Sequence, residues 1–160
     1  MTLKEKMCIV VNEFLLMDEN DKRYIKRNIQ KEYMNLEARE MIKILRLKSF
    51  FASREVYLHE DMIWYFMRIF AMNNFKNGTY LFGTAMKKLS NKYSSIERKL
   101  EVIINQQSME ESYAKTLLLR QIRFLNSEKI CLNLETLFTE LLMWNNEDKI
   151  TQTNWINQYI

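Results

Sequence analysis

The sequence contains very little of the residue types that build turns and metal sites. Its 160 residues include 2 glycines, no proline, 1 histidine and 2 cysteines. Average composition would give about eleven glycines and about eight prolines at this length. The shortage argues against turn-rich sandwiches and barrels. Because a biased composition alone could produce it, the prediction of an all-helical fold must rest on periodicity.

The same shortage restricts catalysis and metal binding. There is one histidine, His59, no glycine-rich loop, and a separation of 123 positions between Cys8 and Cys131. Zinc ribbons, phosphate loops and disulfide frameworks are therefore not expected, and neither are a cofactor, a metal or an enzyme. We interpret both cysteines as small buried residues. His59 precedes Glu60 and Asp61, but adjacent helical side chains diverge, so helix capping is the favoured interpretation.

Long apolar runs are also missing. The longest, residues 62–72, is interrupted by Arg68 and falls well short of the roughly 20 residues that span a bilayer. The first 15 residues lack the extended apolar region of a signal peptide. We therefore expect a cytoplasmic protein without a membrane partner.

Apolar residues recur at helical spacing along nearly the whole chain, which predicts a compact bundle of about eight or nine helices. Residues 62–72 are apolar on all sides, which indicates a central buried helix. The polar segment 73–78 is the clearest loop. The chain is thus expected to be one domain, 1–160, that could divide into lobes 1–74 and 79–160. We also expect Gly83 to permit close helix packing.

Helix boundaries follow from periodicity and capping signals. Asn20 or Asp21 is expected to cap the second helix, Asn133 the eighth, and Ser94–Glu97 and Ser108–Glu111 match the capping box. The first five predicted helices are 3–17, 21 to about 34, 36–48, 62–72 and about 80–91. Each capping box then begins a helix, and the helix that begins at the second box ends near residue 125. The last two helices are 134–144 and one that contains Trp155.

Charge is unevenly distributed. The net charge is +4, yet residues 1–20 carry 2 basic and 4 acidic groups, residues 21–130 carry 21 and 12, and residues 131–160 carry 1 and 4. A basic middle section is what a phosphate-binding surface requires. The candidate nucleic-acid-binding residues form four clusters along the chain: Arg39, Lys43, Arg46 and Lys48; Lys87, Lys88 and Lys92; Arg98 and Lys99; and Lys115, Arg120 and Arg123.

Helical geometry places Lys115, Arg120 and Arg123 on one flank of their helix, at about 0°, 140° and 80°. A surface built from such flanks would bind a phosphate backbone without reading its sequence. Most aromatic residues recur at helical spacing and are expected in the core.

Three stretches in the second half resemble a known family, the small subunit (CasB family) of the type I-E CRISPR surveillance complex Cascade. One is Leu81-Phe82-Gly83-Thr84-Ala85, followed by the 96–100 helix. The next is 118–125, rich in leucine and arginine, followed by Ser127-Glu128. The third is 132–144, a polar turn at 145–148, and then Trp155-Ile156-Asn157-Gln158-Tyr159. The resemblance covers roughly residues 36–160.

The resemblance implies an all-helical, non-catalytic subunit that pairs with a second copy and assembles with the backbone and large subunits of Cascade. It further implies contact with guide RNA and with the target and displaced DNA strands, which would stabilise the R-loop during antiviral defence. Thr84 stands where the family often has arginine, which removes one candidate phosphate contact.

Two other functions remain open. A helical adaptor would use its basic surface to bind acidic proteins and would have no affinity for oligonucleotides. A stand-alone DNA-binding regulator would discriminate between duplex sequences.

Overall fold

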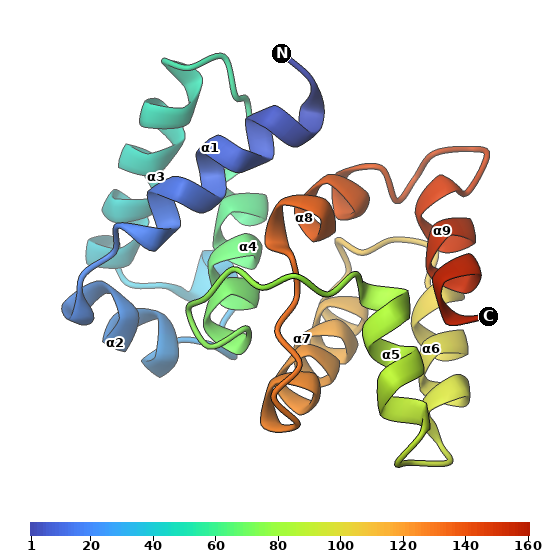
Figure 1. The fold of residues 1–160 in the computed structure, drawn as a ribbon. Coiled ribbons are helices and arrows are strands. Elements are labelled where there is room, and N and C mark those ends of the chain that lie inside the picture. The colour runs from blue at the N-terminus through green and yellow to red at the C-terminus, as the bar shows by residue number, and fades with distance from the viewer.

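The computed structural model describes residues 1–160 and is all-helical, which confirms the predicted fold class and number of helices (Figure 1). None of the helices combines the length and apolar character needed to cross a membrane. The elements, in chain order, are α1 (Leu3–Leu15), α2 (Glu19–Arg27), the short 3-10 helix η1 (Tyr33–Asn35), α3 (Ala38–Ala52), α4 (Glu60–Met72), α5 (Phe82–Ser90), α6 (Ile96–Ile104), α7 (Ser112–Ser127), α8 (Leu134–Leu142) and α9 (Ile150–Tyr159).

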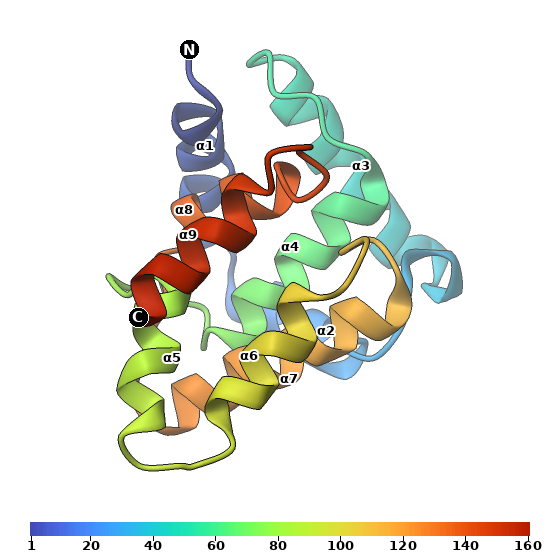
Figure 2. The ribbon, with the colours of Figure 1, turned by 90° about the vertical axis from the view of Figure 1, so that its right-hand side faces the viewer.

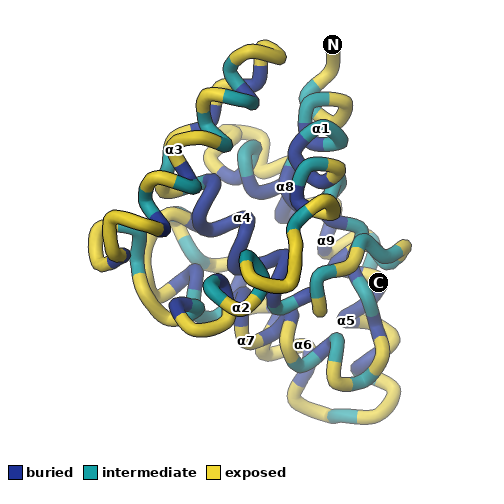
Figure 3. The backbone as a smooth tube through the Cα atoms, turned by 90° about the vertical axis from the view of Figure 1, so that its left-hand side faces the viewer, coloured by how far each residue is buried: buried dark blue, intermediate teal, exposed yellow.

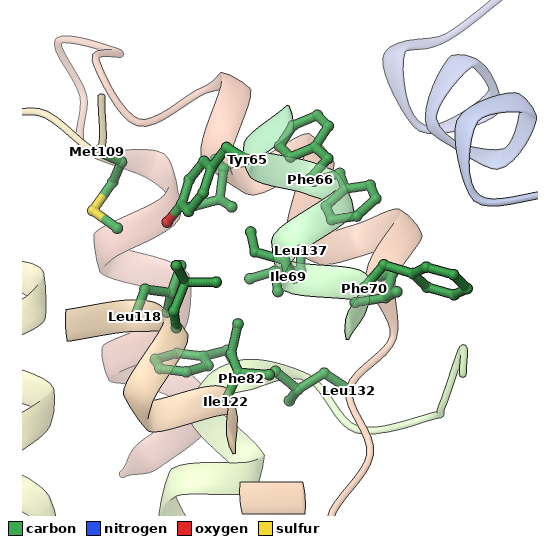
Figure 4. Close-up of a cluster of buried hydrophobic side chains, with 14 of the residues drawn as sticks. Tyr65, Phe66, Ile69, Phe70, Phe82, Met109, Leu118, Ile122, Leu132 and Leu137 are labelled. Carbon is green, nitrogen blue, oxygen red and sulfur yellow. The ribbon is translucent and has the colours of Figure 1, made fainter. Parts of the chain in front are cut away.

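Helix α4 is the centre of the bundle, as its uniformly apolar sequence predicted. Every residue from Ile63 to Ala71 is buried, and the helix lies surrounded by the others in Figure 3. It packs against α2, α3 and α7. Its Tyr65, Phe66 and Ile69 meet side chains from α7 and α8 in the cluster of Figure 4. Burial on all sides explains why this helix has no polar face.

The segment 73–78 connects the two halves but does not separate their cores. The Asn73 side chain is fully buried and donates to the backbone oxygens of Lys76 (2.8 Å) and Leu132 (2.9 Å). Its carbonyl oxygen accepts from the Asn126 side chain at 2.8 Å and from the Leu132 backbone at 3.0 Å. The loop is therefore tied to residues more than fifty positions away. One continuous cluster of buried hydrophobic residues includes side chains from both halves.

Both glycines lie where a larger residue would not fit. A Cβ on Gly83 would lie 2.3 Å from the backbone oxygen of Trp155, where α5 crosses α9. The expected close helix packing at Gly83 is thus confirmed. A Cβ on Gly78 would lie 2.2 Å from the Cys131 oxygen, because residues 78–80 run alongside 131–133 as a short hydrogen-bonded pair.

Several predicted helix ends were wrong. Helix α2 is capped by Asp18, whose carboxylate accepts from the Asp21 backbone at 2.9 Å, and it stops at Arg27 instead of near residue 34. At this end Asn28 is the C-cap, and its side chain donates to the Tyr24 carbonyl at 2.9 Å. Helix α3 runs 38–52 rather than 36–48.

Neither predicted capping box forms. Helices α6 and α7 begin without a side-chain cap, and the Ser108 hydroxyl accepts from the Glu110 backbone in a turn that precedes α7. The Asn133 cap of α8 is confirmed: its side chain accepts from the Thr136 backbone at 2.9 Å.

Candidate nucleic-acid interface

The first basic cluster lies on α3, and two of its four cations have acidic partners. Lys43 pairs with Asp21 at 2.6 Å and Lys48 with Glu60 at 2.6 Å. The hydrogen bond from Lys48 is the main cause of the lowered pKa of Glu60. Arg39 stacks over the Tyr24 ring, 4.4 Å from its centroid. Arg46 makes no ion pair, but it lines a cavity of about 400 Å³ that also contains three acidic residues, Glu13, Asp21 and Glu40.

The second cluster, at the end of α5, is tied to aromatic and acidic side chains. Lys88 donates to the Tyr80 hydroxyl at 2.6 Å, and Lys92 pairs with Glu128 at 3.0 Å. Hydrogen bonds from Tyr93 and Lys92 lower the pKa of Glu128. Lys87 lies over the Tyr159 ring, 5.3 Å from its centroid. All three lysines are exposed, but Lys92 is already neutralised.

Lys115 does not share the exposed flank of Arg120 and Arg123, which corrects the expectation from helical geometry. It is only 7% exposed and pairs with Glu32 at 3.3 Å, with its amine 5.5 Å from the centroid of the Tyr65 ring. The flank of α7 that carries Lys115 packs against α4, whereas Arg120 and Arg123 are exposed. Burial and pairing remove Lys115 from the surface available to a strand.

The third cluster and Arg120 meet in one groove. Helices α6 and α7 lie side by side (Figure 2), and between them is a cavity of about 530 Å³ lined by Arg98, Lys99 and Arg120. We call it the α6–α7 groove. Its remaining lining residues are Ser95, Val102, Ile103, Leu117, Gln121 and Phe124. No acidic side chain lines this groove, and none of its three cations takes part in an ion pair.

A second cavity adjoins the groove through Arg120. It has a volume of about 320 Å³ and is lined by Arg68, Arg120 and Arg123, together with Ile29, Gln30, Met72, Thr116 and Leu119. We call it the α7 pocket. It too has no acidic lining residue.

Arg68 is the one lining arginine that the sequence did not predict as a binding residue, since in the sequence it only interrupts an apolar run. A lone arginine in a uniformly buried helix was the available signal, because such a charge requires partners.

These two cavities combine features that suit a nucleic-acid backbone. Guanidinium groups bind phosphate through paired hydrogen bonds, and charge-assisted bonds of this kind are roughly twice as strong as neutral ones. The apolar floor of the α6–α7 groove, formed by Val102, Ile103, Leu117 and Phe124, can contact sugars and base faces. Nothing in this arrangement selects one base over another.

The sequence contains three other residues that could act in catalysis or metal binding: His59, Cys8 and Cys131. His59 is the N-cap of α4, and its Nδ1 accepts from the Asp61 backbone at 3.2 Å, which confirms the capping interpretation. Cys8 and Cys131 are free thiols and only half-buried, so they lie at the margin of the core rather than inside it. Burial is the main cause of the raised pKa of both thiols.

Comparison with known proteins extends this picture. A search of curated proteins and a search of solved structures each gave no significant match. Among protein families, the model of the CRISPR-associated protein Cse2 matches residues 26–159. This range includes α3 to α9 and all the basic clusters, and it begins ten residues before the stretch in which the sequence resemblance was noted. The chain therefore belongs to the Cse2 family, the small subunit of the type I-E CRISPR complex Cascade.

Proposed function

We propose that this chain is a non-catalytic Cascade subunit that binds a nucleic-acid backbone through the α6–α7 groove and the α7 pocket, and thereby stabilises the R-loop. One observation carries the proposal: Arg98, Lys99, Arg120 and Arg123 line two adjoining cavities without a single acidic neighbour in either lining. The α3 and α5 clusters are secondary candidates, because several of their cations already have partners.

The energetics of R-loop formation make such a surface effective. Guide–target pairing replaces a DNA duplex of similar stability, so the exchange is nearly balanced. A few phosphate contacts, each contributing about 1 kcal/mol or more, are enough to favour the open state. Because guide pairing supplies sequence specificity, this subunit needs to recognise only charge and shape. The bound strand is guide RNA, target DNA or displaced DNA, and a second copy of the chain would extend the surface.

Charge reversal tests the proposal directly. In assembled Cascade, Arg120→Glu combined with Arg123→Glu should lower the affinity for target DNA about 10- to 100-fold at roughly 100 mM salt. The negative slope of log affinity against log salt should become shallower by about one to two units, because two phosphate contacts are lost. Both residues are exposed and unpaired, so the fold should survive, which circular dichroism would verify.

The matched control is Lys4→Glu combined with Arg23→Glu. It makes the same change in net charge at two exposed, unpaired cations that line neither cavity. Control and wild type should bind target DNA alike. If both double variants weaken DNA binding equally, the effect comes from net charge alone. Unchanged binding by the Arg120/Arg123 variant would overturn the proposal and favour the adaptor function.

A further inference from the structure

The α7 pocket contains an arginine whose placement the overall positive charge does not explain. Arg68 comes from the middle of the buried helix α4 and is 3% exposed. Its Nε donates to the Ile29 carbonyl at 2.8 Å, which fixes the orientation of the guanidinium. That is its only hydrogen bond: Nη1 forms an ion pair with the Glu32 carboxylate at 3.6 Å, a separation too long for a hydrogen bond. The guanidinium therefore lines the cavity with its Nε–H bonded to the backbone and its buried Nη1 without a hydrogen-bond partner.

The surroundings of Arg68 have an excess of positive charge. Two buried cations, Arg68 and Lys115, share the single carboxylate of Glu32 at 3.6 and 3.3 Å. Burial lowers the pKa of Arg68, and Glu32 only partly opposes this. Arg120 and Arg123 add two more cations at the rim of the same cavity. Uncompensated buried charge is costly, so an arrangement of this kind is stabilised when an anion binds.

The geometry points to a phosphate site, and we infer that the α7 pocket binds one phosphate group of a nucleic-acid backbone, with Arg68 as its buried anchor and Arg120 and Arg123 as rim ligands. Three guanidinium groups can supply several charge-assisted donors to one phosphate. The α6–α7 groove differs, because its cations lie over an apolar floor and none of them is buried. The inference rests on the proposed function and adds a fixed point at which a passing strand is held in register.

A phosphate titration at constant ionic strength, followed by NMR of arginine Nε–H signals, tests the pocket in the full-length chain. Inorganic phosphate should produce saturable shifts of the Arg68 and Arg123 signals while leaving the signal of Arg23, an exposed arginine that lines neither cavity, unmoved. Arg123→Gln should lower the phosphate affinity about tenfold. Arg23→Gln is the control, since it removes an exposed arginine that lines neither cavity. Arg68→Gln would remove a buried hydrogen bond to the Ile29 backbone and disturb the fold, so the test relies on the rim variant Arg123→Gln.

A second measurement separates this inference from the proposed function. Binding of a single-stranded oligonucleotide is compared for wild type, Arg98→Gln and Arg123→Gln. If Arg123→Gln weakens both phosphate and strand binding, the pocket is supported. If Arg98→Gln alone weakens strand binding, the interface stands and the phosphate site is wrong. If neither variant changes strand binding, the proposed function fails. Equal or absent phosphate shifts across all the arginines would overturn the pocket regardless of the strand result.

Discussion

At the scale of single residues, burial decides what a charged side chain does, and burial is what the sequence conveys least. Lys115 and Arg120 lie on the same helix and both looked like surface cations. One is paired inside the molecule and the other is exposed. Arg68 was set aside as an interruption, yet it lines the α7 pocket. Each outcome depends on which neighbouring helix covers a given flank, and no local pattern encodes that choice.

Glu140 supplies a prediction at this scale. It lies on α8, is 7% exposed, and its Oε1 makes no hydrogen bond. Burial raises its pKa from 4.5 to about 7. The folded state therefore binds this proton more tightly than the unfolded state does. The stability that the proton contributes is complete below pH 4.5 and is lost as the pH rises through about 7.

Replacing Glu140 by glutamine should remove this pH dependence. Between pH 5 and pH 8, the free energy of unfolding of the wild type should fall by up to about 3 kcal/mol more than that of Glu140→Gln. Urea unfolding at both pH values measures the difference. Glu101→Gln, at an exposed position, should behave like the wild type. Parallel pH profiles for wild type and Glu140→Gln would contradict the prediction.

At the scale of secondary-structure elements, periodicity identified the helices but their ends were set by contacts. The apolar spacing was sufficient to predict eight or nine helices, of which nine form, and to place α4 at the centre. The Asn133 cap was correct, since its side chain accepts from the Thr136 backbone three residues on. The two capping boxes were wrong, although the local sequence matched. A matching local sequence therefore does not guarantee a cap, and helix ends are less well determined by sequence than the helices themselves.

At Gly83, helix propensity and side-chain packing predict opposite effects of an alanine substitution on stability. Alanine in an isolated helix would add about 1 kcal/mol of stability relative to glycine. In this protein its Cβ would overlap the Trp155 backbone, so Gly83→Ala should instead destabilise by about 1 to 3 kcal/mol. Thermal unfolding, with near-ultraviolet circular dichroism of the tryptophans, would detect the repacking. The exposed neighbour provides the control, as Thr84→Ala should be neutral or slightly stabilising. Stabilisation by Gly83→Ala would show that α5 and α9 can separate without cost.

At the scale of the whole molecule, the 73–78 loop looked from sequence like a boundary between lobes. In the structure, buried Asn73 bonds to segments on the far side of the loop, and hydrophobic residues of both halves pack together. We therefore predict that the chain unfolds as a single domain. In a urea series followed by hydrogen exchange and mass spectrometry, peptides from α1–α4 and from α5–α9 should lose protection at the same urea concentration. Loss of protection in one half while the other stays protected would support two lobes.

The sequence alone determined the class of fold, the buried central helix, the close approach at Gly83 and the excess of positive charge in the middle of the chain. These properties are carried by composition and by the spacing of residues close to one another in the chain. Only the tertiary structure decided which basic residues are neutralised, which remain free, and that Arg68, Arg120 and Arg123 share a cavity. The physical reason is that ion pairing, burial and cavity formation depend on distances between different helices, and those distances exist only once the helices have packed.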